Sequence, residues 1–191
     1  MGNRLSKIYT RTGDDGASAL ADGQRISKTA KVFDAMGDID ELNSHIGMAL
    51  CLLKQLPPAQ FNSQQTQHEL TVIQHLLFNL GGELAMPAYQ GINQTHIDWL
   101  EQSIDQMNQT LPPLKDFILP AGTQLVCQIH IARSVARRAE RKCVALKPAI
   151  SPPALMLINR LSDYLFVLAR FATPSQHINE TLWDSQILGT L

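Results

Sequence analysis

Apolar residues recur at every third or fourth position through most of the chain, which is the spacing of one face of an α-helix. The pattern predicts helices over about residues 31–56, 68–85, 95–107, 123–146 and 154–171. Proline-rich stretches interrupt it between several of these segments, as expected where a helix ends. No segment alternates apolar and polar residues convincingly, so no strand is expected. We therefore expect an all-α five-helix bundle.

The helical boundaries divide one domain, residues 1–191, into an N-terminal segment (1–30), a helical bundle (31–171) and a C-terminal tail (172–191). Hydrophobic residues make up 45% of the chain and aromatic residues only 6%, which predicts a large aliphatic core. A net charge of −1 argues against nucleic acid and membrane surfaces as partners. No signal sequence is visible and no apolar run reaches the roughly 20 residues that span a bilayer. We expect a cytoplasmic protein.

Cysteine and histidine positions give no sign of a metal centre. The three cysteines, Cys51, Cys127 and Cys143, form no Cys-x-x-Cys pair and have apolar neighbours, so we expect reduced thiols in the core. The histidines have no ligand spacing, and the Glu-x-x-His pairs of di-iron bundles are absent. No metal held by protein side chains is expected.

The fourth predicted helix carries a row of cations beside its apolar stripe. Arg133, Arg137 and Arg141 share an arc with Glu140, and Arg138 lies further round the helix. Such a row suits a solvated face with ion pairs one turn apart. Four arginines against a single glutamate favour an anion instead, because guanidinium groups match phosphate oxygens. Both interpretations stay open on spacing alone.

Two further polar stretches carry candidate chemistry. The N-terminal stretch "KIYTRTGDDGAS" combines glycines with hydroxyl side chains, and its backbone N–H groups could cradle phosphates. It contains no Walker A or dinucleotide fingerprint, and a disordered arm is the alternative. The stretch "DIDELNS" begins at Asp38; acidic residues there suit the start of a helix. Asp40, however, borders the apolar stripe and is a candidate partner for an arginine of the fourth helix.

Four stretches, taken together and in order, resemble the PduO-type ATP:cob(I)alamin adenosyltransferases. They are "KIYTRTGDDG", "GDIDELNSHIG", "ARSVARRAER" and "LINRLSDYLFVLAR", and the resemblance runs from about Lys7 to Arg170. It implies a five-helix bundle that assembles as a homotrimer with active sites between subunits. It also implies that the N-terminal segment is mobile until it closes around ATP.

The resemblance assigns roles to particular residues. The nucleotide positions it implies are Thr10, Arg11, Thr12, Gly13, Ser18, Ala19, Lys28, Arg137, Arg138, Ala139, Glu140, Arg141 and Asn159. Arg137 stands where the family meets the phosphates. Asp40 and Arg133 match a pair that forms a salt bridge between subunits near the corrinoid. Phe117 matches an aromatic residue that displaces the lower ligand of the corrinoid. These last four are the catalytic and corrinoid-binding candidates.

The implied reaction transfers the 5′-deoxyadenosyl group of ATP, with its Mg²⁺, to the cobalt of cob(I)alamin or another reduced corrinoid. Adenosylcobalamin forms and tripolyphosphate leaves, and a separate corrinoid reductase supplies the electron. Two other functions remain possible: a corrinoid carrier that binds ATP without turnover, and a kinase that releases ADP. For Phe117 the sequence alone favours another role, an anchor of its loop on the core.

Overall fold

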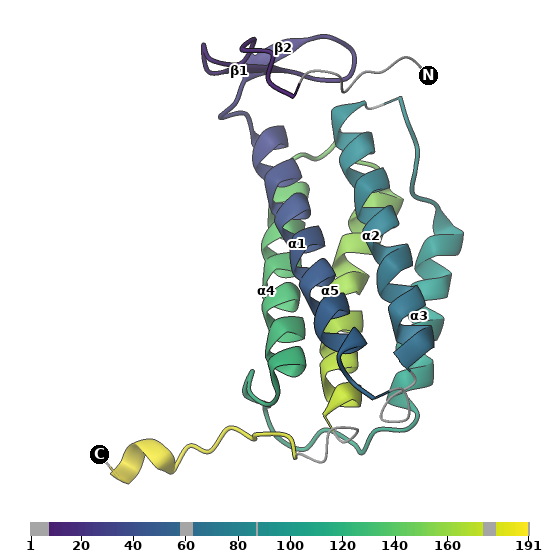
Figure 1. Ribbon diagram of the computed structural model, residues 1–191, viewed down its shortest axis with the longest axis vertical. Helices are drawn as coiled ribbons and strands as arrows, with labels where there is room; N and C mark the ends of the chain where they lie inside the picture. Colours follow the sequence, from purple (N-terminus) through teal and green to yellow (C-terminus); the bar gives the residue numbers. More distant parts are fainter. Residues whose placement is uncertain (1–7, 58–62, 87, 174–178, 191) are drawn as a thin grey trace.

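The expected all-α five-helix bundle is confirmed by the computed structural model, which describes residues 8–57, 63–86, 88–173 and 179–190 (Figure 1). The helices are α1 (Lys31–Lys54), α2 (Ser63–Ala85), α3 (Gln94–Asn108), α4 (Gln124–Val144) and α5 (Pro152–Ala172). Helix α4 packs against α1 and α5, α1 packs also against α2, and α5 packs also against α3. A short 3-10 helix, η3 (Ile187–Thr190), ends the described chain.

Helix α2 begins at Ser63, five residues before the predicted start at His68. The polar stretch of residues 60–67 instead predicts a loop or a frayed helix start. Ser63 and Thr66 are buried, and the Gln65 amide donates a 2.9 Å hydrogen bond to Glu69, one turn on. Ser63, Thr66 and Glu69 therefore face the core of the bundle. The apolar pattern missed them because their burial depends on tertiary partners and not on their own hydropathy.

Helix α3 begins one residue before the predicted start, with a different cap from the one expected. Asn93 is the N-cap residue, its side chain accepts from the Thr95 amide, and the His96 side chain accepts in return from the Asn93 amide. The spacing of Thr95 and Asp98 in the sequence predicts a capping box between these two residues instead, and that prediction is wrong. For α4 and α5 the caps are Thr123, as predicted, and Ser151.

The expectation of no strand is wrong, because the N-terminal segment contains a small antiparallel hairpin. Strands β1 (Ala17–Ala19) and β2 (Arg25–Ser27) pair with Ser18 opposite Ile26. Gly23 allows the turn between them, since its φ of 87° lies in the left-handed region. The Ala21 amide donates to the Ala85 carbonyl at 3.0 Å, which ties the hairpin to the end of α2. Strands of three residues are too short for alternation to be visible in the sequence.

The core is aliphatic, as predicted, and the apolar stripe of α4 is buried throughout: Leu125, Ile129, Ala132, Ala136, Ala139 and Cys143. Burial raises the pKa of the Cys143 thiol to about 12, with a further contribution from the charges of Asp38 and Glu140. Cys127 is only partly buried, and Cys51 is exposed, so the prediction of a core position is wrong for Cys51. Its apolar neighbours in the sequence lie on other faces of α1.

One buried polar pair joins α5 to α2. The Tyr164 hydroxyl, which is completely buried, donates to Glu69 at 2.8 Å. Burial raises the pKa of Tyr164 well above its usual range, and the charge of Glu69 adds to this shift. The pair satisfies two polar groups that would otherwise lie unbonded in the core.

We expect Tyr164→Phe to lower the free energy of unfolding by about 1–3 kcal/mol, because the buried Glu69 carboxylate loses a hydrogen-bond donor. Urea denaturation at one fixed protein concentration measures the change. Tyr89→Phe is the matched control, since the exposed Tyr89 hydroxyl makes only a 3.3 Å bond to Asn79. An equal effect of the two substitutions would contradict a structural role for the Glu69–Tyr164 pair.

Candidate active site

Helices α1 and α4 run antiparallel and are joined by a ladder of ion pairs along their border. Lys142 contacts Asp34 at 3.0 Å, and Arg138 contacts Asp38 at 3.2 Å and also Glu41. The last turns of α4 therefore lie beside the first turns of α1, at the end of the bundle where the hairpin lies (Figure 1). Arg138, expected at the nucleotide, is already paired with two carboxylates of its own chain.

Helix α5 brings Asn159 to the same end. The Asn159 amide donates to the Glu140 carboxylate at 2.7 Å, which joins two of the residues expected at the nucleotide. The Arg141 guanidinium is exposed and donates to the Arg137 carbonyl, and Ala139 lies between them on the buried face of α4. The second expected nucleotide segment is thus gathered at one end of the bundle.

Arg133 and Arg137, one helical turn apart on α4, form a pair of cations without a counterion. Within the described ranges neither side chain makes a hydrogen bond or an ion pair, although the Nε atom of Arg133 is buried. Burial lowers the pKa of the Arg133 guanidinium, and the positive charge of Arg137 lowers it further. A partly buried cation beside a second, exposed cation is unfavourable alone, so this position suits an anion.

The N-terminal segment lies at the end of the bundle where α4 ends (Figure 1). Lys28 Nζ donates to the Gly13 carbonyl at 2.7 Å, and a Cβ atom on residue 13 would lie 2.9 Å from that nitrogen, so the lysine end would have to shift for any other residue. The Thr10 and Thr12 hydroxyl oxygens lie 2.8 Å apart. Arg11 has a left-handed φ of 62°, and its guanidinium lies 5.6 Å from the centre of the Tyr9 ring.

Ser18 and Ala19, the remaining expected nucleotide residues of this segment, lie in β1. The hairpin thus places Thr10 to Gly13, β1 and Lys28 in one folded unit. The predicted mobility of this segment remains a prediction.

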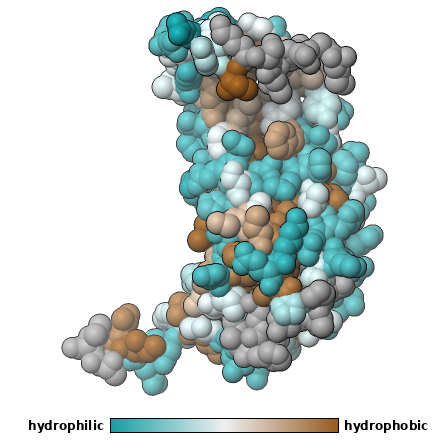
Figure 2. Space-filling model, viewed as in Figure 1, coloured by the Kyte–Doolittle hydropathy of each residue, from teal (hydrophilic) through white to brown (hydrophobic). Residues whose placement is uncertain are grey.

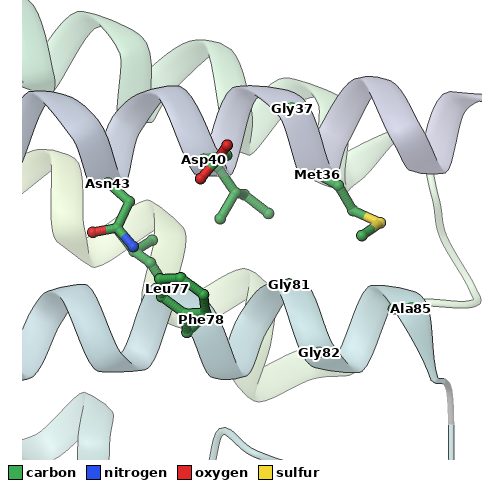
Figure 3. Close-up of a pocket in the computed structure, with 10 residues that line it drawn as sticks. Met36, Gly37, Asp40, Asn43, Leu77, Phe78, Gly81, Gly82 and Ala85 are labelled. Atoms are coloured by element: carbon green, nitrogen blue, oxygen red, sulfur yellow. The ribbon is translucent and has the colours of Figure 1, made fainter. Parts of the chain in front are cut away.

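Asp40 lines a groove between α1 and α2 that encloses about 520 Å³. Met36, Asp40 and Asn43 come from α1, and Leu77 and Phe78 face them from α2 (Figure 3). The groove is mainly apolar, and Phe78 is 71% exposed. The Asp40 carboxylate makes no hydrogen bond or ion pair to any described residue. A carboxylate at the edge of an apolar groove suits a large, mostly apolar ligand or a cation from outside the chain.

No contact joins Asp40 to Arg133 among the residues that the structure describes. Arg133 belongs to α4, and a second groove follows another part of the surface of α4, from Pro120 to Arg141. His130 lines this groove, its Nδ1 atom is buried without a hydrogen bond, and burial together with the Arg133 charge lowers its pKa. Asp40 thus lines the first groove, whereas Arg133 is not among the residues that line the second.

Phe117 lies in the α3–α4 connection, at the end of the bundle opposite the hairpin (Figure 1). Its side chain is 79% exposed, so the alternative of an anchor on the core is wrong. Within one chain the structure therefore does not bring Phe117 to the cations or the hairpin. The groove along α4 runs from this connection towards the arginines of α4, since Pro120 lines it together with Arg138 and Arg141.

The sequence did not predict the carboxylates that form ion pairs with Arg138 and Lys142. In the sequence these partners are only acidic residues near the start of a helix: Asp34, Asp38 and Glu41. Their spacing of four and three positions does place them on one face of that helix. Among the described residues no group of histidine, cysteine or carboxylate side chains could hold a metal ion, and no helix is long and apolar enough to cross a membrane.

Comparison with known proteins places this geometry in a family. The family model described as cobalamin adenosyltransferase matches residues 8–172. A cobalamin adenosyltransferase of Cupriavidus metallidurans is 44% identical, over 97% of this chain and 98% of its own length. The human corrinoid adenosyltransferase is 38% identical, over 94% of this chain and 74% of its own length. The chain therefore belongs to the cobalamin adenosyltransferase family.

A solved structure agrees with this assignment. A variant of the PduO-type ATP:corrinoid adenosyltransferase from Lactobacillus reuteri, complexed with cobalamin and ATP, is 37% identical and superposes with a TM-score of 0.85. The match covers 94% of this chain and 97% of that one. The resemblance found in the sequence is confirmed, and with it the class of enzyme, a transferase.

Two neighbouring arginines are expected to behave differently in the absence of ligand. Arg138→Ala removes ion pairs that are about half exposed, so we expect the free energy of unfolding to fall by about 1 kcal/mol. Arg137→Ala should not lower it, because the substitution removes a like charge beside Arg133. Urea denaturation of the nucleotide-free protein measures both. Equal losses for the two variants would show that Arg137 also has a partner within the protein.

Proposed function

We propose that this protein is an ATP:cob(I)alamin adenosyltransferase. Cobalt(I) of a reduced corrinoid attacks the C5′ atom of ATP with its own electron pair, a Co–C bond forms, and the C5′–O bond breaks. Tripolyphosphate leaves with the electrons of that bond. No protein group needs to remove a proton, so the protein acts by holding C5′ near cobalt and by stabilising charge on the leaving polyphosphate.

One observation carries this proposal: Arg133 and Arg137 stand together without a counterion among the described residues, on the helix that ends beside the N-terminal segment. A polyphosphate supplies the missing negative charge, and Mg²⁺ arrives with ATP. The L. reuteri relative, which is complexed with cobalamin and ATP, supports both ligands. The implied nucleotide roles of Ser18, Glu140 and Asn159 fit the same end of the bundle.

We also propose a homotrimer in which Asp40 of one subunit pairs with Arg133 of the next. The support is that neither charge has a partner among the described residues of its own chain and that Asp40 lines a groove on the surface. A corrinoid would occupy the α1–α2 groove with its apolar ring edge. Both substrates would then meet between subunits, in the cytoplasm, with the electron supplied by a separate reductase.

Phe117 completes the proposed site. An exposed aromatic ring is available to press against the lower face of a corrin ring and to exclude the axial ligand from cobalt. Removing that ligand favours cobalt(I) over cobalt(II), which makes the reduction easier. The exposure of Phe117 supports this role over an anchoring one, because the ring makes little contact with its own core.

The function is tested by incubating the protein with ATP, Mg²⁺ and chemically reduced cob(I)alamin under anaerobic conditions. We expect a light-sensitive Co–C bond and one tripolyphosphate for each adenosylcobalamin formed. ADP as the phosphate-containing product would identify a kinase. Tight binding of both ligands without product would identify a carrier, and either result would overturn the proposal.

Arg137→Ala should lower kcat/KM for ATP by about 30- to 150-fold, which corresponds to about 2–3 kcal/mol for a lost charge-assisted contact. Steady-state assays at saturating cob(I)alamin measure the loss. Lys54→Ala provides a control, since Lys54 lies in the last turn of α1, at the end of that helix away from the hairpin. An unchanged kcat/KM in Arg137→Ala would remove this residue from the site.

Asp40→Ala and Arg133→Ala should be strongly non-additive. Each single substitution leaves the other charge unmatched at the subunit border, so the double variant should lose little more activity than either single one. Kinetic assays of all four proteins give the coupling, and light scattering gives the assembly. Additive losses, or a monomer at micromolar concentration, would contradict a pair shared between subunits.

A further inference from the structure

The C-terminal tail pairs with the connection that carries Phe117. Ile118 and Leu182 form an antiparallel bridge. On its two sides the Trp183 amide donates to the Phe117 carbonyl at 2.7 Å, and the Leu119 amide donates to the Thr181 carbonyl at 2.8 Å. Residues 181–183 thus run as a second strand beside residues 117–119, although more than sixty positions of sequence separate them.

A buried arginine holds both partners of this pairing. Arg170, in the last turn of α5, is only 5% exposed. Its Nε atom donates to Glu180 at 2.7 Å, and its Nη2 atom donates to the Pro112 carbonyl at 2.9 Å. One guanidinium therefore binds the start of the Phe117 connection and the start of the tail strand. We name these two contacts the Arg170 clamp.

The connection has few other attachments to the bundle. Only Leu111, Ile118, Ala121 and Thr123 are even partly buried between the ends of α3 and α4, and Phe117 itself is exposed. The tail is equally dependent, because residues 181–189 are all exposed and extend away from the bundle (Figures 1 and 2). Two weakly attached segments that pair with each other need an attachment to the bundle. The Arg170 clamp provides a buried attachment.

We propose that Arg170 and Glu180 are positioning residues for Phe117: the clamp fixes the tail strand, and the tail strand fixes the backbone of Phe117. The proposal rests on the proposed role of Phe117 at the corrinoid. Neither residue touches substrate. The tail, which the family model does not cover, thereby becomes part of the machinery for the cobalt(II) reduction step.

The Glu180 side chain is the residue to change, because it lies outside the helices and is 22% exposed, so its loss should spare the bundle. Glu180→Ala breaks the clamp, and Glu180→Gln keeps an oxygen that accepts from Arg170. Glu101→Ala is the matched control. Glu101 also pairs with an arginine of α5, Arg160, at 2.9 Å, but no hydrogen bond or ion pair joins it to the described residues of the connection or the tail.

The first measurement tests the clamp without reference to catalysis. In a Trp99→Phe background Trp183 is the only tryptophan, and it lies in the paired strand. Glu180→Ala should lower the fluorescence anisotropy of Trp183 and increase its quenching by acrylamide. Glu180→Gln and Glu101→Ala should leave both unchanged. An unaltered Trp183 signal in Glu180→Ala would overturn the proposal at its first step.

The second measurement compares two routes to product. Starting from cob(II)alamin and a reductant, Glu180→Ala should be slower by about 10- to 100-fold, the scale expected for a misplaced group in a site. Starting from chemically prepared cob(I)alamin, the rate of Glu180→Ala should stay within about twofold of the rate of the unsubstituted protein. In a separate measurement, the visible spectrum of cobalt(II) bound to Glu180→Ala should lose the four-coordinate form. A purely structural role would depress both routes equally, and that result would overturn the proposal.

A double-mutant cycle with Phe117→Ala separates the two hypotheses. If the clamp acts through Phe117, adding Glu180→Ala to Phe117→Ala should cost nothing further in the cobalt(II) route. Additive losses would overturn the clamp as a device for Phe117 while leaving Phe117 in the site. If Phe117→Ala is itself harmless in the cobalt(II) route, the proposed role of Phe117 fails, whatever the Trp183 fluorescence shows about the clamp.

Discussion

The arrangement depends on the packing of α4, one face of which must be fully buried while cations line its edge. Ala132, Ala136 and Ala139 are completely buried, and such small side chains let α1 and α5 approach closely. Close approach brings Arg138 and Lys142 onto the carboxylates of α1. The same packing leaves Arg133 and Arg137 without a counterion in the part of the chain that the structure describes, and the proposed chemistry uses this pair.

The chain therefore divides its cations into two kinds that look alike in sequence. Arg138, Lys142 and Arg170 have carboxylate partners within the chain and hold elements together. Arg133 and Arg137 have none among the described residues, and desolvation lowers the pKa of Arg133. Keeping uncompensated charges costs stability in the free protein, and that cost is recovered when an anion or a partner subunit arrives.

The two ends of the bundle supply different parts of the proposed site. The hairpin end gathers hydroxyl groups, Lys28 and the α4 cations, which suit phosphates. The opposite end presents an exposed aromatic ring on a connection held by the C-terminal tail. The helices fix the distance between these ends, while short strands and one buried guanidinium hold the segments that we propose contact ligands. Such a division keeps the scaffold rigid and leaves the contacting segments adjustable.

The sequence by itself determined the five helices, the buried stripe of α4 and the family, because helical periodicity and short motifs depend on residues close together in the chain. It did not determine the hairpin, the start of α2 at Ser63 or the exposure of Cys51. Nor could it separate Arg138 from Arg137, or link Arg170 to Glu180 and Pro112. Only the tertiary structure decided these points. Whether a charged or polar side chain is paired, buried or free depends on which distant segment packs beside it. The spacing of residues along the chain does not identify that segment.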